Sequence, residues 1–412
     1  MKDERKNTPV IRFAGFFDAW ELRKLGEVAE IVGGGTPSTG NPEYWGRDID
    51  WYSPAEIGDQ DYVSGSQKKI THLGLQKSSA KILPAGTVLF TSRAGIGSTA
   101  ILAKEGATNQ GFQSILPRKN VLDSYFIYSR TGELKRYGEV TGAGSTFVEV
   151  SGKQMAQMPI CIPDIKEQEQ IGSFFKQLDG TITLHQRKIE AIQQIKKGFL
   201  QQMFPTNEES VPRGRFADFE EKWEQRKLSE LAESFEYGLN ATSTDYNGEN
   251  KYLRITDIDD NSREFIQDGL TSPDIDLSSA DNYKLQKGDV LFARTGASVG
   301  KTYRYQEKDG LVYYAGFLIR ARIKPEFDSD FVFQNTLTDR YNNFIRITSQ
   351  RSGQPGVNAK EYGDFQISVP NFDEQKKIGK FFKSIDDLFT LHQDQLNKLK
   401  TVKKAYLQNM FI

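Results

Sequence analysis

The sequence predicts an α+β fold class with an internal pseudo-twofold repeat: two α+β domains with curved or partly closed sheets, joined by two long helices. The first observation behind this prediction is that short stretches at the start of each half of the chain align without gaps, as do longer stretches at the end of each half. The second is an apolar heptad pattern in the longer stretches, which is typical of a coiled coil. Two such helices in one chain most simply pair with each other, and the intervening domain lets the second return antiparallel.

The length and composition of the chain fit this two-domain prediction. A chain of 412 residues exceeds what one hydrophobic core usually organises, and 37% hydrophobic residues are enough to fill two cores. The formal net charge of −1 weighs against a general nucleic-acid coating protein, although a local basic face stays compatible with it. Cys161 is the only cysteine, so we expect neither a disulfide framework nor a thiolate metal site.

The chain shows no membrane or export signal. No apolar run approaches the roughly 20 residues that a membrane span needs. The charged start, MKDERKNTPV, has no apolar stretch behind it and does not resemble a signal peptide. We therefore expect no membrane partner and a cytoplasmic location.

The repeat frames each half of the chain. Residues 13–25 read FAGFFDAWELRKL and align with residues 216–228, which read FADFEEKWEQRKL. Residues 163–204 align in the same way with residues 370–411. Between these ends the halves diverge and keep only short landmarks, which include GTVLF with GDVLF and Gly111-Phe112 with Gly316-Phe317. Plain duplication of a structural unit is one interpretation, but this divergence favours two domains that each read a different target.

The repeat also sets the domain boundaries. We expect a first domain over residues 13–160 and a first long helix over residues 161–204. A linker over residues 205–215 leads to a second domain over residues 216–369 and a second long helix over residues 370–412.

The two long helices carry apolar residues at alternating steps of four and three. A paired rod of this kind acts as a ruler that holds two domains at a fixed separation. The two histidines at equivalent positions of the seam would allow a metal or catalytic role, but no cluster of carboxylates or cysteines accompanies them, so polar residues that fix the register are favoured. The predicted seam consists of Ile171, Phe175, Leu178, Ile182, His185 and Ile189 in the first helix, and Ile378, Phe382, Ile385, Phe389, His392 and Leu396 in the second. Lys196 and Lys403 continue it at equivalent positions.

Within the domains, short alternating runs predict strands and longer runs predict helices. Strands are expected over residues 86–90, 288–292 and 366–370. Helices are expected over residues 126–137 and 330–346.

Loops rich in Gly, Ser, Thr, Asn, Gln and Arg recur at matching places of both domains. Small residues let a ligand approach the backbone, hydroxyls and backbone amides meet phosphates, and Arg, Asn and Gln read base edges with two hydrogen bonds. We expect DNA contacts in the first domain from Gly35, Thr36, Ser38, Thr39, Lys68, Lys69, Ser92, Arg93, Asn109, Gln110, Gln113, Ser145 and Thr146. In the second domain we expect them from Arg254, Arg294, Thr295, Tyr313, Tyr314, Gln350, Arg351, Gln354 and Asn358.

No catalytic motif is complete. Residues 296–302, GASVGKT, are one residue short of a phosphate-binding loop, and YRY follows where a helix should begin. Residues 41–44, NPEY, resemble the Asn-Pro-Pro-aromatic motif of amino-methyltransferases, but Glu43 replaces its second proline. With one Cys and three His, neither a Ser-His-Asp nor a Cys-His set is credible. We expect no catalytic residue, no metal and no cofactor.

The repeated F-x-x-F-x-x-x-W-E-x-x-K/R-L segment, the R-x-G turn after each GTVLF-type strand, the Glu-Gln pair and the long helix together resemble the specificity subunit of type I restriction-modification systems. The R-x-G turns are Arg93 with Gly95 and Arg294 with Gly296. The resemblance covers essentially the whole chain, and the duplicated architecture is its most specific part.

This resemblance implies that two target recognition domains each read one half of a gapped, asymmetric site on double-stranded DNA. It implies an antiparallel coiled coil between them, recruitment of two methylation subunits, and restriction subunits that join this core. Methyl-donor and ATP chemistry then belong to the partners. Two rivals remain: a fused modification enzyme, which would need the motifs that are missing, and a coiled-coil adaptor whose domains bind proteins without reading DNA.

Overall fold

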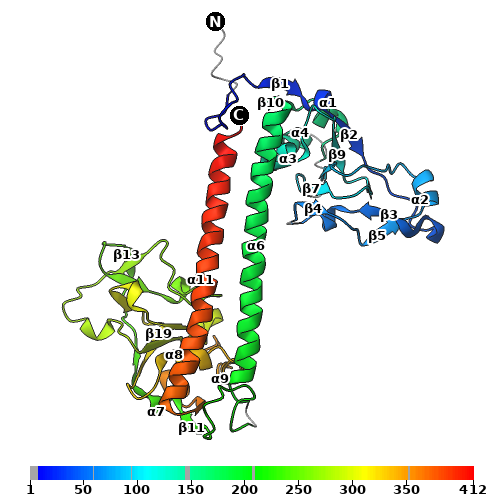
Figure 1. Cartoon of the computed structure of the whole chain (residues 1–412). Helices are drawn as coiled ribbons and strands as arrows, with labels where there is room; N and C mark the ends of the chain where they lie inside the picture. Colours follow the sequence, from blue (N-terminus) through cyan, green and yellow to red (C-terminus); the bar gives the residue numbers. More distant parts are fainter. Residues whose placement is uncertain (1–7, 59, 94, 144–148, 207–208, 351–352) are drawn as a thin grey trace. The chain divides into compact units, whose positions relative to one another are not determined.

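The computed structural model describes the chain except for residues 1–7, 59, 94, 144–148, 207–208 and 351–352 (Figure 1). The chain forms two compact units, each described by itself below. Unit 1 consists of residues 1–185 and 396–412, and unit 2 of residues 186–395. The helices α6 (Ile165–Met203) and α11 (Phe372–Asn409) each contribute one part to either unit.

Unit 1 contains a five-stranded sheet in the order β2-β9-β6-β7-β4, a three-stranded sheet in the order β5-β3-β8, and the antiparallel pair β1-β10. Two of its strand pairs are parallel, β3 with β8 and β4 with β7, so both larger sheets are mixed. The strands are β1 (Glu21–Lys24), β2 (Ala29–Gly33), β3 (Trp45–Tyr52), β4 (Tyr62–Val63), β5 (Lys68–Ile70), β6 (Val88–Phe90), β7 (Thr99–Leu102), β8 (Ala107–Thr108), β9 (Gln113–Pro117) and β10 (Pro159–Ile162). The short helices are α1 (Leu25–Val28), α2 (His72–Gln76), α3 (Ser124–Ser129), α4 (Thr131–Gly142) and α5 (Gly152–Ala156).

Strand β6, in the middle of the five-stranded sheet of unit 1, is buried on both faces. Successive side chains of a strand point to opposite faces, and in β6 Val88 and Phe90 enter the core that α3, α4 and α6 cover. Leu89 points the other way, into a second core with Tyr52 and Phe112. Burial on both sides explains why this strand reads as an uninterrupted apolar run.

Unit 2 repeats this plan with a four-stranded sheet in the order β12-β19-β16-β17 and the pairs β11-β20, β13-β15 and β14-β18. In β16, Val290 and Phe292 enter one core, and Leu291 enters another with Tyr303. The strands are β11 (Glu224–Lys227), β12 (Ala232–Tyr237), β13 (Ser243–Asp245), β14 (Lys251–Leu253), β15 (Thr271–Pro273), β16 (Asp289–Ala293), β17 (Thr302–Arg304), β18 (Val312–Tyr314), β19 (Leu318–Ile323) and β20 (Gln366–Val369). The helices are α7 (Leu228–Leu231), α8 (Ser329–Asn335), α9 (Asp339–Thr348) and α10 (Ala359–Gly363). The predicted α+β class is confirmed.

The helices predicted over residues 126–137 and 330–346 are each split in two. In unit 1 α3 ends at Ser129 and α4 begins at Thr131. In unit 2 the hydroxyl of Thr336 donates to the carbonyl of Phe333, and that of Thr338 accepts from the amide of Tyr341. These threonines satisfy the exposed backbone groups of a helix end, so the chain stops and restarts its helix there.

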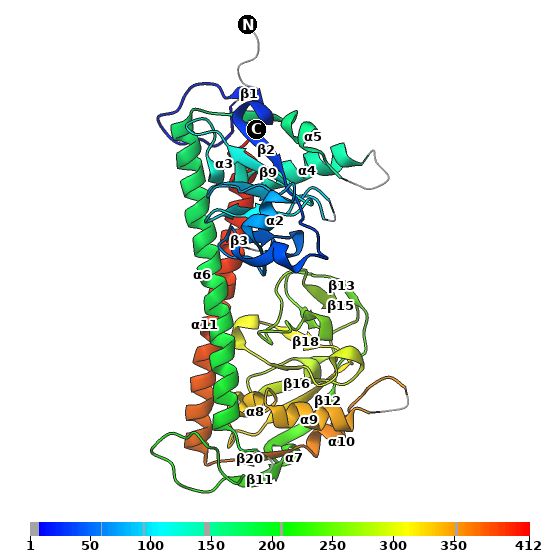
Figure 2. The same ribbon diagram turned by 90° about the vertical axis from the view of Figure 1, so that its right-hand side faces the viewer.

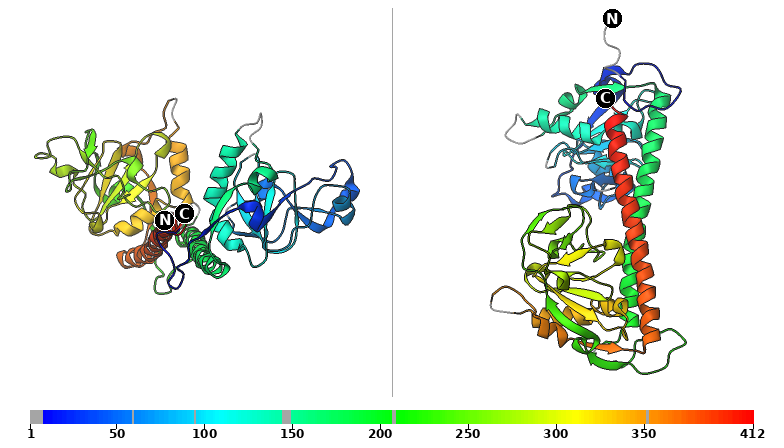
Figure 3. Two further views of the ribbon diagram at one scale, coloured as in Figure 1. Left: turned by 90° about the horizontal axis from the view of Figure 1, so that it is seen from above. Right: turned by 90° about the vertical axis from the view of Figure 1, so that its left-hand side faces the viewer.

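In unit 1, the first part of α6 and the last part of α11 lie side by side and run antiparallel (Figures 1 and 2). The ring centroids of Phe174 and Tyr406 are 5.0 Å apart, and those of Phe175 and Phe411 are 5.7 Å apart. Lys403 forms an ion pair with Asp179. Beside them the amide of Ile11 donates to the carbonyl of Asn409, so the end of α11 meets the segment before β1 (Figure 3).

In unit 2, the other parts of the same two helices make the equivalent contacts. Phe199 meets Phe381 at 4.9 Å and Phe204 meets Phe382 at 5.8 Å. Lys196 Nζ lies 2.6 Å from Asp386 Oδ1. Each of these pairs matches one of unit 1 under the repeat, and every predicted seam position in the two helices is buried or half-buried.

The Glu-Gln pair at the start of each long helix fastens the domain to it. In unit 1, Arg12 donates two hydrogen bonds of 2.7 and 2.8 Å to the buried carboxylate of Glu167. Arg215 makes the same two bonds to Glu374 in unit 2.

The glutamine of the pair binds the backbone at the start of an earlier helix of the same unit. Gln168 Oε1 accepts from the amide of Asp123, which caps α3. Gln375 accepts from the amide of Asp328, which caps α8. The repeated motif is therefore explained by scaffold contacts alone.

Candidate nucleic-acid interface

In unit 1, three of the polar loops meet at the ends of β2, β6 and β9. The amide of Gly35 donates to the carbonyl of Thr108, and the hydroxyl of Thr36 forms a hydrogen bond with the side-chain oxygen of Gln110. The amide of Ser92 donates to the carbonyl of Gly111. Loops far apart in the sequence thus form one continuous cluster.

The equivalent strand ends of unit 2 bring together its own loops. The amide of Leu239 donates to the carbonyl of Tyr314, and the amide of Arg294 donates to that of Phe317. The loop before α10 joins them, because the amide of Gly296 donates to the carbonyl of Pro355. The polar loops of the two units therefore lie at equivalent strand ends, as expected from the sequence.

Backbone pairing fixes which loop residues are equivalent. It agrees with the GTVLF and GDVLF landmark and differs by one residue from the R-x-G turns and the Gly-Phe landmark. Phe90 pairs with Thr99 and Phe292 with Thr302, which makes these two phenylalanines equivalent. Two residues later, the carbonyl of Ser92 accepts from Val150 and that of Arg294 accepts from Val357. Arg294 therefore matches Ser92, and Arg93 matches Thr295, so the predicted equivalence of the two R-x-G turns is wrong.

The second landmark shifts in the same way. The carbonyl of Phe112 accepts from Gly34, and that of Leu318 accepts from Gly238. Phe112 therefore matches Leu318, and Phe317 stands where unit 1 has Gly111. The sequence alignment pairs the two Gly-Phe dipeptides because they look alike, although the strands are offset.

Some predicted contact residues are buried. Ser92 and Tyr314 are fully buried, and Tyr313 is 2% exposed. The two tyrosines belong to β18 and fill cores of unit 2. Gly35 is also buried, and a Cβ there would overlap the backbone of Ser79 and Ala80. In this conformation these side chains are not available to a ligand.

Most other predicted residues are exposed or half-buried. In unit 1 these are Thr36, Ser38, Thr39, Lys68, Lys69, Arg93, Asn109, Gln110 and Gln113. In unit 2 they are Arg254, Arg294, Thr295, Gln350, Gln354 and Asn358. Ser145, Thr146 and Arg351 lie outside the described residues.

Several of these groups already have intramolecular partners. Arg254 donates bidentate bonds of 2.8 Å to Asp257, and Asn358 caps α10. Lys69 lies 3.1 Å from the buried carboxylate of Asp50. The side-chain oxygen of Asn109 accepts from the amide of Gly111. Their geometry is set by the fold before any ligand binds.

Two aromatic residues of the unit 2 cluster were missed by the sequence reasoning. Tyr237 is 43% exposed, and Phe317 is 63% exposed. Within residues 313–317, YYAGF, the sequence predicts DNA contacts from the two tyrosines and none from the phenylalanine. Alternation along the strand could not show that the tyrosines are buried. Tyr313 points into a core on one face of β18, and Tyr314 points into a core on the other face.

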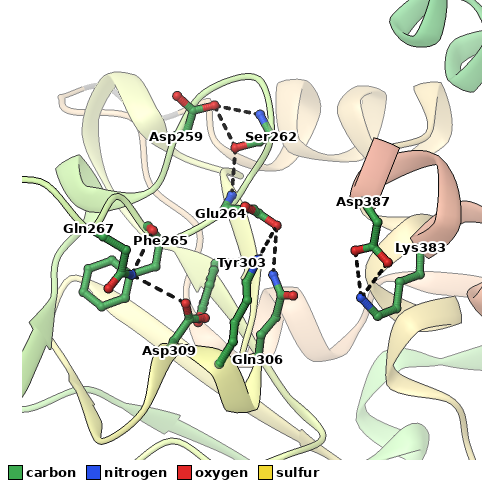
Figure 4. A network of polar contacts seen from close by, with 11 residues as sticks. Asp259, Ser262, Glu264, Phe265, Gln267, Tyr303, Gln306, Asp309, Lys383 and Asp387 are labelled. Atoms are coloured by element: carbon green, nitrogen blue, oxygen red, sulfur yellow. Dashed lines mark hydrogen bonds and ion pairs between the residues drawn. The ribbon is translucent and has the colours of Figure 1, made fainter. Parts of the chain in front are cut away.

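A polar network supports the loop that precedes β15 in unit 2 (Figure 4). Asp259 accepts from the amide and the hydroxyl of Ser262, and Gln306 donates to Glu264. Beneath them Tyr303 donates a 2.6 Å hydrogen bond to Asp309 (Figure 4). Burial raises the pKa of both Tyr303 and Asp309.

The same loop borders a cavity of about 850 Å³ between the end of α6 and the start of α9. Arg263, whose φ is 59°, and Arg340 line it, and burial lowers the pKa of both guanidinium groups. Of its two lining carboxylates, Asp260 is paired with Lys301 and Asp339 accepts from Gln201.

None of the helices among the described residues combines the length and the apolar character that crossing a bilayer requires. No group of three or more His, Cys, Asp or Glu among those residues is arranged to hold a metal ion.

Comparison with known proteins identifies relatives of this architecture. The MjaIX type I restriction enzyme specificity subunit of Methanocaldococcus jannaschii is 32% identical over 303 residues, which are 68% of this chain and 67% of that protein. The EcoR124I/EcoR124II specificity subunit of Escherichia coli is 29% identical over 167 residues, covering 39% of this chain and 41% of that one. The crystal structure of a type I restriction-modification S subunit from M. genitalium superposes with a TM-score of 0.67 at 15% identity, covering 98% of this chain and 99% of that one, and shows the same fold. A family model described as "Type I restriction modification DNA specificity domain" matches residues 18–194 and 220–401, and this chain belongs to that family.

Proposed function

We propose that this chain is the DNA-recognition subunit of a type I restriction-modification assembly, and that each unit reads one half of a bipartite, gapped, asymmetric site. The observation that carries the proposal is the contrast between scaffold and loops. The contacts of the long helices are repeated pair by pair in both units, whereas the loop residues at equivalent strand ends differ. A duplicated scaffold with divergent loops suits two different half-sites held by one frame.

The repeated contacts between the long helices include ion pairs as well as apolar contacts. The pair of Asp179 with Lys403 has its equivalent in Asp386 with Lys196. An ion pair between facing helices favours one register over others, because a shift by one turn leaves both charges without partners. A fixed register gives a fixed gap between the half-sites in this proposal.

The loop side offers the chemistry that base reading needs. Amide side chains such as Gln110 and Gln113 can donate and accept at an adenine edge, and guanidinium groups such as Arg294 suit guanine. The hydroxyls of Ser38 and Thr39 are exposed and suit phosphate oxygens. No cofactor is required for reading.

The partners in this proposal are double-stranded DNA, two methylation subunits and restriction subunits that join them. Apolar side chains on the long helices support docking of partner helices. Leu184 in unit 1 is 51% exposed, and Leu388 and Leu391 in unit 2 are each 50% exposed. Leu184 and Leu391 are equivalent under the repeat, so each unit would offer one methylation subunit the same contact. The assembly would act in the cytoplasm, and its chemistry would belong to the partners.

Mapping methylated adenines across the host genome, with and without this gene, tests the proposal. We expect one bipartite gapped motif that disappears when the gene is deleted and returns when it is restored. Co-purification of the chain with the methylation subunits is the accompanying control for assembly. A methylation pattern that stays the same after deletion would contradict the proposal and would favour an adaptor that does not read DNA.

A further inference from the structure

Three neighbouring strand ends carry small residues in unit 1 and large ones in unit 2. In unit 2, Tyr237 pairs with Ile319, the residue after Leu318. In unit 1, Gly33 pairs with Gln113, the residue after Phe112. Because Phe112 matches Leu318, Gly33 matches Tyr237. The other two matches follow from the backbone hydrogen bonds described above. The pairs are Gly33 with Tyr237, Ser92 with Arg294 and Gly111 with Phe317.

The guanidinium of Arg294 lies over the ring of Tyr237, 4.9 Å from its centroid. Within the described part of the chain it has no hydrogen-bond acceptor and no carboxylate in ion-pair range. Stacking on an aromatic face holds the guanidinium plane and leaves its edge of N–H donors open. Tyr237 is itself held, because its hydroxyl accepts from the amide of Ala359 at 3.3 Å.

Phe317 adds a large apolar group beside this donor edge. Its carbonyl accepts from the amide of Arg294 at 3.0 Å, so the two side chains leave adjoining positions of the backbone. The ring is 63% exposed, whereas its neighbours Ala315 and Leu318 are buried. Leaving a phenylalanine in water forgoes the hydrophobic stabilisation that burial would give, which fits a group that is covered in a complex.

We propose that Arg294 and Phe317 are base-reading residues of unit 2, and that Tyr237 positions Arg294. Arg294 donates to O6 and N7 of a guanine in the major groove, and Phe317 packs on the C5 methyl of a thymine next to it. Both are pairings that the groove edges of these bases select. The inference rests on the proposed function and assigns these bases to the half-site of unit 2 alone, because unit 1 has Ser92 and Gly111 there.

The test uses the whole complex of this chain with its methylation subunits and duplexes that carry the mapped site. Each guanine of the half-site read by unit 2 is replaced in turn by 7-deazaguanine, which lacks N7, and each thymine by uracil, which lacks the C5 methyl. One 7-deazaguanine should weaken binding by the unaltered complex about 5-fold or more. One uracil next to it should weaken binding about 4-fold.

Variants identify which side chain senses each atom. Arg294→Ala should bind the guanine and 7-deazaguanine duplexes equally, and Phe317→Ala should bind the thymine and uracil duplexes equally. Arg294→Lys keeps the charge but loses the planar fork, so it too should lose sensitivity to N7 while keeping the thermal stability of the complex. Arg346→Ala, at an exposed position of α9, is the matched control that should keep both sensitivities.

A unit 2 half-site without guanine, or an Arg294→Ala complex as sensitive to 7-deazaguanine as the unaltered one, would overturn the assignment of Arg294. Equal sensitivity to uracil in the Phe317→Ala complex would overturn that of Phe317. In either case a bipartite motif that depends on the gene would still stand. An unaltered complex that binds the 7-deazaguanine and uracil duplexes as tightly as the unmodified duplex would overturn both assignments. Equal binding to duplexes with and without the mapped motif would instead count against the proposed function itself.

Discussion

Asp50 is a buried carboxylate that unit 1 holds in its charged form. Burial favours the neutral acid, but hydrogen bonds from Lys104, Ser66 and Lys69 outweigh this effect and lower the pKa of Asp50 well below its usual value. Lys104 Nζ lies 2.7 Å from Oδ2, and the amide of Ser66 donates to Oδ1 at 3.0 Å. The carboxylate thereby joins β3 to the strand and the loops around it.

This arrangement predicts an acid-labile region around β3 and β5. Because the pKa of Asp50 is lower in the folded state, its stabilisation is present above the ordinary aspartate pKa of 3.8 and is lost as the pH falls below that value. Hydrogen exchange of the β3 and β5 amides between pH 6 and 3 measures it. Asp50→Asn should flatten this dependence, whereas Asp48→Asn, at an exposed position of β3, should not. Equal profiles for both variants would contradict the assignment.

Tyr303 and Asp309 form a buried polar pair in unit 2. Tyr303→Phe removes the donor and leaves the carboxylate of Asp309 under-satisfied, which should destabilise unit 2 by about 1–3 kcal/mol. Exchange of the β16 and β17 amides reports this loss. Tyr305→Phe removes a hydroxyl that donates to Gly310 near the surface and should have a smaller effect. Similar losses in both variants would argue against a special role of the buried pair.

At the residue scale, the sequence predicted the kinds of side chain in the loops better than their positions. Arg294 is half-buried and its guanidinium has no hydrogen-bond acceptor among the described residues, but its match in unit 1 is Ser92 and not Arg93. Two arginines that follow equivalent strands look equivalent in the sequence even when they are offset by one residue. Only the hydrogen bonds between strands fix the register and show the offset. Phe317 was overlooked beside Tyr313 and Tyr314 for another reason: both tyrosines are buried, on opposite faces of β18, so no alternation marks them as core residues.

At the element scale, the long helices were the most predictable feature, because the same heptad pattern runs along both of them, over helices of 39 and 38 residues. The observed helices begin at Ile165 and Phe372, after the predicted starts at residues 161 and 370. The predicted start at residue 161 is wrong, because residues 161 and 162 belong to β10. The glycines in their first turns also have a reason, since a Cβ at Gly172 or Gly379 would collide with the carboxylate that caps α3 or α8. The shorter helices were less predictable, because each predicted run is divided in two, in unit 2 by hydrogen bonds of Thr336 and Thr338 to the backbone at the helix ends.

The ion pairs between the long helices should set their antiparallel register. Asp386→Lys places two lysines opposite each other and should destabilise unit 2, and Lys196→Asp in the same chain should restore much of the loss. We expect a coupling energy of about 0.5–3 kcal/mol from a double-mutant cycle on chemical denaturation.

The matched control is the exchange of Lys383 and Asp387, an exposed pair within one helix. Its coupling should be only about 0.3–0.5 kcal/mol. A cross-helix coupling no larger than this control would show that apolar packing alone sets the register.

At the scale of the whole molecule, the net charge of −1 limits what the isolated chain can do. Tight binding to duplex DNA requires many phosphate contacts, each of which releases counterions and steepens the dependence on salt. We therefore expect the isolated chain to bind duplex DNA weakly and with a shallow salt slope, and the complex with methylation subunits to bind tightly. Titrations at several salt concentrations measure both. A steep slope and tight binding by the chain alone would contradict the idea that partners supply phosphate contacts.

The central claim is that two units on one scaffold read two different half-sites. Replacing residues 13–160 by the equivalent domain of a relative, and mapping the methylated adenines that the resulting complex produces, tests it most directly. The account predicts that one half of the bipartite motif changes to the relative's half while the other half and the gap between them stay as they were. A motif that stays unchanged in both halves, in a chain that still assembles with its methylation subunits, would contradict the account.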